Sequence, residues 1–249
     1  MPRKLLWWAT VVCAVVFSPN LNAQTNPVLS LRLMEDDAGT VLGQPCTVVE
    51  QTEVTQQLAD GTTLTQHTVV HKWRDDRGRF RRESAGVKGD EAPVFQHASI
   101  IDPVNKTFVN LNLDRKTATV YHLPDSGPDA LHPYVDQFDK EILALPGVQV
   151  KVEKLGGKTI AGVYAEGRRV TRIRPPGTVG NDKPIVSVRD QWVAQDLKIL
   201  LASSLDDPRH KQVDQVTQLD RSEPDPGLFT IPSDFTVKDV TVPASQNGQ

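Results

Sequence analysis

The stretch that decides the fold is TVVEQTEVTQQLADGTTLTQHTVVHKWR, residues 47–74. Two runs rich in Thr, Val and Gln, Thr47–Leu58 and Thr62–Arg74, flank Ala59-Asp60-Gly61. Residues branched at Cβ favour strands, and Asp-Gly supplies the positive φ that a tight hairpin turn needs. The stretch therefore predicts two long antiparallel strands joined by a turn.

The same alternation of strand-like runs and turn residues continues to the end of the chain. We expect further strands over Arg79–Ala85, His97–Ile101, Thr107–Leu113, Thr117–Leu123, Gln149–Leu155, Thr159–Tyr164, Arg168–Arg174, Ile185–Ala194, Lys198–Ser203 and Lys211–Leu219. In this pattern Gly156-Gly157 and Glu166-Gly167 are expected to form turns.

One segment has a helical pattern. Asp129–Leu145 carries apolar residues three or four positions apart, which makes one helical stripe, and Pro146-Gly147 ends it. The sequence therefore predicts a mainly β protein. Its core would be a curved antiparallel sheet or half-open barrel of about ten or eleven strands, with one helix packed on it.

The N-terminus has the layout of a bacterial secretion signal. Arg3 and Lys4 precede an apolar run of 13 residues, Leu5–Phe17, and Ala23 offers a small residue for cleavage. A membrane-spanning helix needs about 20 residues, so the run is too short to be an anchor. We expect cleavage after Ala23 and a periplasmic or secreted protein with no transmembrane span after cleavage.

The remaining chain divides into a 24–46 N-terminal lead-in, a single β-rich domain at 47–238 and a flexible tail at 239–249. Without residues 1–23 it has 26 Lys and Arg against 31 Asp and Glu, a charge that does not suit nucleic-acid binding. Cys46 is then the one cysteine left, so no intramolecular disulfide forms, and we interpret Cys46 as a small buried hydrophobic residue.

The sequence lacks the common motifs of zinc sites, serine hydrolases and nucleotide-binding proteins. His67 and His71 are four residues apart in an expected strand, which separates them by about 13 Å, too far to bind one metal ion. The sequence has neither a Gly-x-Ser-x-Gly motif nor a glycine-rich phosphate loop. We therefore expect no catalytic residues, no metal and no cofactor, and an envelope hydrolase is the least favoured function.

Aromatic and arginine residues are the ligand-binding candidates. Aromatic side chains on a curved sheet can line a hydrophobic cavity, and arginines can bind an anionic headgroup, although core packing and salt bridges across strands use the same residue types. Arginines gather in two segments, residues 77–82 and 168–174. The candidates are Trp73, Phe108, Tyr121, Trp192, Arg79, Arg81 and Arg172.

Several short motifs resemble a group of uncharacterised exported bacterial proteins over roughly residues 50–240. They are Gly78-Arg79-Phe80-Arg81-Arg82-Glu83, Ile101-Asp102-Pro103, Leu155-Gly156, Ile160-Ala161-Gly162, Gln191-Trp192, Asp207-Pro208-Arg209, Glu223-Pro224-Asp225 and Leu228-Phe229-Thr230-Ile231-Pro232. The layout is also similar to the LolA/LolB-like (RseB-like) lipoprotein-carrier superfamily, which implies a half-open barrel, an apolar cavity for acyl chains and no catalytic residues. The chain departs from the carriers in lacking their long N-terminal helix.

These observations favour a non-enzymatic periplasmic binding or carrier domain for an acyl chain or another amphipathic envelope ligand. Possible partners are therefore a lipid or the acyl chain of a lipoprotein. The alternative is an envelope sensor or protein-interaction module that uses the same sheet to bind a protein partner. A large apolar cavity would favour the carrier, whereas an exposed apolar or arginine-rich patch would favour the interaction module.

Overall fold

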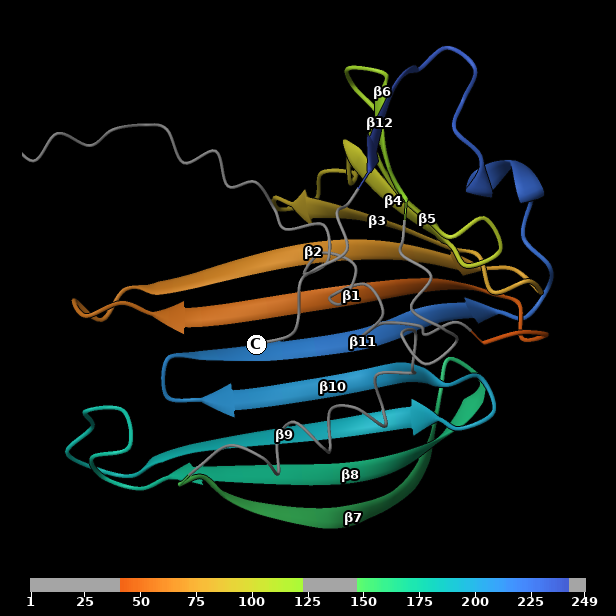
Figure 1. Ribbon diagram of the computed structural model, residues 1–249. Helices are drawn as coiled ribbons and strands as arrows, with labels where there is room; N and C mark the ends of the chain where they lie inside the picture. The colour runs from red at the N-terminus through yellow and green to blue at the C-terminus, as the bar shows by residue number, and fades with distance from the viewer. Residues whose placement is uncertain (1–40, 123–146, 242–249) are drawn as a thin grey trace, which may run out of the picture.

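The computed structural model describes residues 41–122 and 147–241, which form one open, curved sheet of 12 strands (Figure 1). This confirms the mainly β class and the curved antiparallel sheet predicted from the sequence. The described residues contain one short 3-10 helix, η2 (Pro226–Phe229), and no α-helix. The secretion signal and the helix expected at 129–145 lie outside the described residues.

The strands account for most of the described chain. Their bounds are β1 (Cys46–Gln57), β2 (Thr63–Arg74), β3 (Phe80–Val87), β4 (His97–Asp102), β5 (Thr107–Asn112), β6 (Thr117–His122), β7 (Gln149–Ile160), β8 (Val163–Arg174), β9 (Ile185–Ala194), β10 (Ile199–Asp207), β11 (His210–Asp220) and β12 (Thr236–Thr241).

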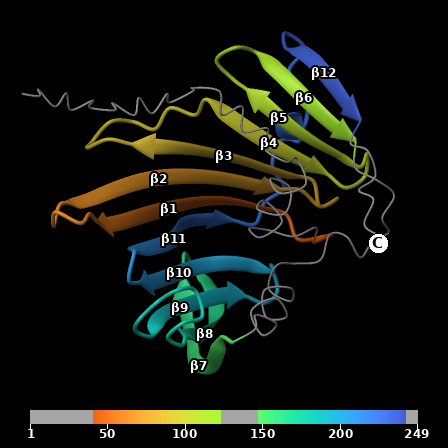
Figure 2. The same cartoon turned by 60° about the vertical axis from the view of Figure 1, so that its left-hand side comes forward.

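The sheet order is β12-β6-β5-β4-β3-β2-β1-β11-β10-β9-β8-β7. Two meanders, β1 to β6 and β7 to β11, meet at the centre, where β1 pairs with β11 and Thr47 lies opposite Asp220. Neighbouring strands are antiparallel except β12 and β6, which are parallel. Both ends of the sheet bend away from the central strands (Figures 1 and 2).

The hairpin predicted at Asp60-Gly61 is confirmed. The Leu58 amide donates to the Thr62 carbonyl at 2.8 Å, and Gly61 takes a φ of 88°, which glycine adopts without a steric penalty. Twelve residues of β1 pair with β2 in an unbroken register, from Cys46 opposite Arg74 to Gln57 opposite Thr63. Cys46 is buried, as predicted.

The turns expected at Gly156-Gly157 and Glu166-Gly167 were wrong. β7 and β8 form one long hairpin whose turn is Ala161-Gly162, where both residues have positive φ, 47° and 79°. Two positive φ values are the geometry of a type I′ turn, which matches the twist of long strands.

The glycines at the wrongly predicted turns have other uses. The Tyr164 ring lies on Gly157, and a Cβ there would come within 2.1 Å of the Tyr164 hydroxyl oxygen. The Trp192 indole lies on Gly167, and a Cβ there would come within 2.5 Å of indole Nε1. At both positions the missing side chain lets an aromatic ring lie on the backbone. From the sequence alone, a glycine with this role looks the same as a glycine in a turn.

A strap, residues 221–235, leads from β11 past β3 to the far end of the sheet and contains η2 (Figure 1). The strap ends in β12, which extends β6 by parallel pairing from Thr236 opposite Thr117 to Thr241 opposite His122. The sequence did not predict β12, because TVKDVT is short and mostly polar. The strand reaches residue 241 and so enters the segment expected to be a tail.

Candidate ligand-binding face of the sheet

The register divides the side chains of β1 to β6 and of β8 to β11 between two faces. We name them after neighbouring residues of β2: the Lys72 face and the Trp73 face. Residues directly opposite each other on neighbouring strands share a face. Starting from Lys72 and following the pairs from strand to strand therefore shows on which face each side chain lies.

An apolar row crosses the Lys72 face. Phe80 lies opposite Ile101, Ile101 opposite Phe108 and Phe108 opposite Tyr121, so four strands contribute one large side chain each. Phe80, Ile101 and Phe108 are buried and form a hydrophobic cluster separate from the other two, whereas Tyr121 is only partly buried. The Phe108 and Tyr121 rings stack with 5.9 Å between centroids.

A polar row lies next to the apolar row, two residues away from it on β3 to β6, and continues to Lys72 on β2. Its members, in sheet order, are Lys72, Arg82, Ser99, Asn110 and Thr119. Ser99 Oγ donates to Asn110 Oδ1 at 3.1 Å. Lys72 Nζ is 3.0 Å from Glu50 Oε2, and both side chains are almost fully buried. Taking an ion pair out of water is costly, and a charge left buried without its partner costs more still.

A second polar row, the Asp214 row, crosses the other half of the same face. It consists of Thr52, Asp214, Ser203, Gln191 and Arg168, one residue from each of five neighbouring strands. Asp214 accepts hydrogen bonds from Thr52 Oγ1 and Ser203 Oγ, both at 2.8 Å. Gln191 Oε1 accepts from Arg168 Nε at 3.2 Å. The Lys72 face thus carries one apolar row near one end and two rows of hydrogen-bonding groups, one beside the apolar row and one across its other half.

The Trp73 face is covered at one end by the strap. Phe229 of η2 is buried among Ile100, Val109 and Val120, and Trp73 packs at the border of this cluster. Arg81, opposite Trp73, donates from Nη1 to the Leu228 carbonyl at 2.8 Å and from Nε to Glu83 at 2.9 Å. Trp73 and Arg81 therefore hold the strap in place.

Arg79 lies in the turn before β3. Its Nε is 2.6 Å from Asp75 Oδ2, and its guanidinium lies over the Phe229 ring, 4.9 Å from the centroid. Asp75 also accepts from the Arg77 and Arg79 amides, so its carboxylate is used to build the turn. Asp75, Asp76 and Glu223 come close enough together to hold a cation, but Glu223 already caps the Asp76 amide.

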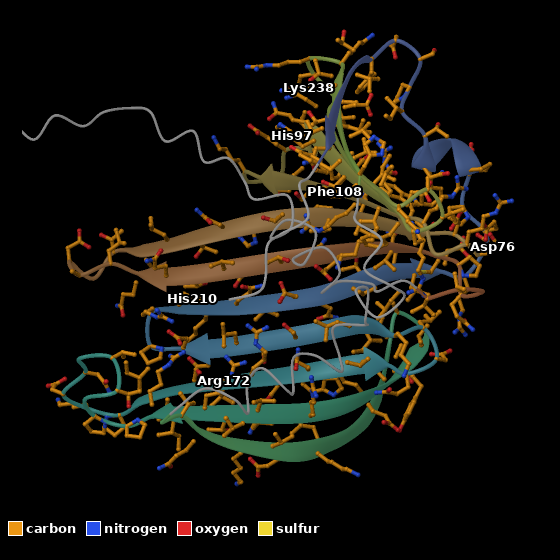
Figure 3. The ribbon with its side chains drawn as sticks, viewed as in Figure 1. Asp76, His97, Phe108, Arg172, His210 and Lys238 are labelled. Atoms are coloured by element: carbon orange, nitrogen blue, oxygen red, sulfur yellow. The ribbon has the colours of Figure 1, made fainter. Side chains whose placement is uncertain are left out.

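Trp192 lies near the opposite end of the sheet. Lys158 Nζ is 3.5 Å from the centre of its ring, a cation–π contact, and Gly167 lies beneath the same ring. Arg172, on the Lys72 face of β8, also lies in this half, and Figure 3 shows it far from Phe108. In the sheet order, five strands separate the arginines of β3 from those of β8, so the two groups do not meet side by side in the sheet.

The structure therefore brings together only some of the candidates named from sequence. Phe108 and Tyr121 form one contact, and Trp73 and Arg81 form another on the opposite face. The Lys72–Glu50 pair and Asp214 were not predicted. Alternation within residues 47–74 already places Glu50 on one face with Val48, but the partner across the sheet depends on a register that the sequence does not reveal.

No protein-family model and no curated protein matches this chain. Among solved structures it is similar to MucB, with a TM-score of 0.41 and 14% identity over 82% of this chain and 62% of MucB, so the chain spans less than two thirds of that protein's length. It is also similar to the lipoprotein LppX of Mycobacterium tuberculosis (TM-score 0.27, 14% identity, 80% of this chain and 97% of LppX).

A LolA superfamily protein from Nitrosomonas europaea is a further similar structure (TM-score 0.25, 8% identity, 81% of this chain and 96% of that protein). Within residues 41–122 and 147–241, no helix is long and apolar enough to cross a membrane.

Proposed function

We propose that this protein is a non-enzymatic binding or carrier domain of the bacterial envelope, whose Lys72 face takes up an acyl chain or another amphipathic ligand. The observation that carries the proposal is the apolar row of Phe80, Ile101, Phe108 and Tyr121 beside a polar row on the same face. An amphipathic ligand needs an apolar surface for its tail and a polar surface for its headgroup, no further apart than the ligand is long.

The apolar row supplies the binding energy. Burial of apolar surface is worth about 25 cal/mol per Å², so an acyl chain that leaves water gains several kcal/mol. Phe80, Ile101 and Phe108 are themselves buried, so this gain comes from the apolar surface of the ligand and of Tyr121. The row reaches the partly buried Tyr121 on β6, next to the edge strand β12. A ligand would contact the row first at Tyr121.

The test uses residues 24–249 purified from the periplasm, with native mass spectrometry before and after lipid extraction. We expect a co-purified acyl-chain ligand, or uptake of added fatty acid or phospholipid. Tyr121→Ala should weaken fatty-acid binding about tenfold, because part of the apolar surface is lost. Tyr164→Ala is the matched control, since Tyr164 is 62% exposed on β8, and it should bind as the wild type does. Protein that carries no lipid and takes up none would overturn the proposal.

The alternative function, a protein-interaction module, needs accessible arginines or an apolar patch. Arg79 and Arg81 instead have side chains that are 17% and 10% exposed and contact Asp75 and Glu83. These two arginines are therefore engaged within the fold. A ligand-free protein that captures an envelope protein would shift the conclusion to the interaction module.

A further inference from the structure

Asp214 is a partly buried carboxylate whose partners are all neutral. Oδ1 accepts from Thr52 Oγ1 at 2.8 Å and Oδ2 accepts from Ser203 Oγ at 2.8 Å, while Gln212 Nε2 lies 2.9 and 3.0 Å from the two oxygens. Within the described residues, no Lys, Arg or His nitrogen lies within ion-pair distance of Asp214. Other acids on these central strands differ: Glu50 pairs with Lys72, and Asp206 pairs with Lys211.

The position of Gln212 shows what the carboxylate can accept. One nitrogen bridges both carboxylate oxygens, which is where a cationic nitrogen would bind. An ammonium group there would make charge-assisted hydrogen bonds, which are about twice as strong as those of a neutral amide. Gln212 belongs to the same strand as Asp214 and is not fully buried, so its side chain can rotate away.

The surroundings of Asp214 suit the head of an amphiphile. Val216, two residues further along β11, is 1% exposed, and so are Val48 and Val70 on the same face. The apolar row begins at Phe80 on β3, three strands from β11, which is about 14 Å across the sheet. Val216 is level with Ser84, so Phe80 also lies four residues, about 13 Å, along β3. A tail that leaves Asp214 toward Phe80 would run diagonally across the sheet, over Val48 and Val70 and past the Lys72–Glu50 pair.

We propose that Asp214 is the headgroup site of the ligand and that the headgroup is an ammonium, as in an amino lipid. The inference rests on the proposed function, since it identifies the polar end of the same ligand. Thr52 and Ser203 hold the carboxylate in place, and Gln212 occupies the site until the ammonium displaces it.

The test compares three probes by isothermal titration calorimetry at neutral pH: dodecylamine, lauric acid and ethylamine. The wild type should bind dodecylamine at least tenfold more tightly than lauric acid. Asp214→Asn should remove this preference without weakening lauric acid. Gln212→Ala should tighten dodecylamine binding, because the internal competitor is gone. Asp206→Asn is the matched control, since Asp206 is exposed on the opposite face, and it should keep the preference.

The outcomes separate the two proposals. Equal binding of dodecylamine and lauric acid overturns the ammonium site and leaves the carrier function intact. Binding of neither overturns the carrier function itself. Ethylamine that binds as tightly as dodecylamine would show a site for free amines and would overturn the assignment to an amphiphile. A Gln212→Ala variant with weakened dodecylamine binding would show that Gln212 belongs to the site and does not compete for it.

Discussion

Cys46 begins β1 and packs among aliphatic side chains of the sheet, including Val48 and Leu201. Burial raises the pKa of its thiol above the ordinary 9.0, and the positive charges of Arg74, Arg221 and Lys72 offset this only in part. The thiol is therefore held in its neutral form, as expected for a residue used as a small hydrophobe rather than as a nucleophile.

The raised pKa predicts how stability depends on pH. The folded state favours the protonated thiol, so the stabilisation is complete below the ordinary pKa and is lost as the pH rises through the folded-state value. Between neutral pH and about pH 10, wild-type protein should lose more free energy of unfolding than Cys46→Ala. Urea titrations at each pH measure the difference, and parallel pH profiles would contradict it.

The Lys72–Glu50 pair makes a second prediction for single residues. Lys72→Met removes a buried positive charge beside a buried carboxylate, which should cost about 3–5 kcal/mol in unfolding free energy. The double variant Lys72→Met/Glu50→Gln should recover at least half of that loss, because the negative charge is removed too. A double variant no more stable than Lys72→Met would show that the two charges are not coupled.

At the scale of a single element, the hairpin of β7 and β8 tests whether Gly167 is needed for the packing of Trp192. Gly167→Ala places a Cβ against the Trp192 indole and should destabilise the protein by about 1–3 kcal/mol, the usual range for overpacking. Gly86→Ala in β3 is the control, since its Cβ would meet nothing within 4 Å and its φ is not positive. Thermal unfolding measures both, and equal melting temperatures for the two variants would refute the packing argument.

Elements were predictable where runs of β-branched residues are bounded by turn residues, as in Thr47–Leu58. They were not predictable where glycine has two uses. Gly61 supplies the positive φ of a turn, whereas Gly157 leaves space for the Tyr164 ring. The sequence alone does not distinguish these two uses of glycine. The candidate site was less predictable than the strands. Trp73 and Phe108 are both aromatic residues of expected strands, and only the long-range register shows that they lie on opposite faces.

At the scale of the whole molecule, an open sheet must protect two edges. β7 carries Lys151, Lys154 and Lys158 and a bulge after Lys154, features that discourage pairing with another chain. The other end is protected by β12, which covers β6, a short strand without lysine.

Removal of residues 236–249 should therefore expose the edge of β6 and cause association. We expect dimers or larger species by light scattering, whereas removal of residues 242–249 alone should leave a monomer-sized particle. A monomeric 1–235 chain would show that β12 is not needed to protect the edge.

The central seam between β1 and β11 has a consequence for how the protein is made. Thr52 and Asp214 are hydrogen-bonded neighbours yet stand 162 residues apart in the chain. At a synthesis rate of about 5–20 residues per second, β1 would wait roughly 10 to 30 seconds for its partner. During that interval the unpaired edge of β1 can pair with a strand of another chain. The yield of newly made protein should therefore depend on chaperones that shield this edge.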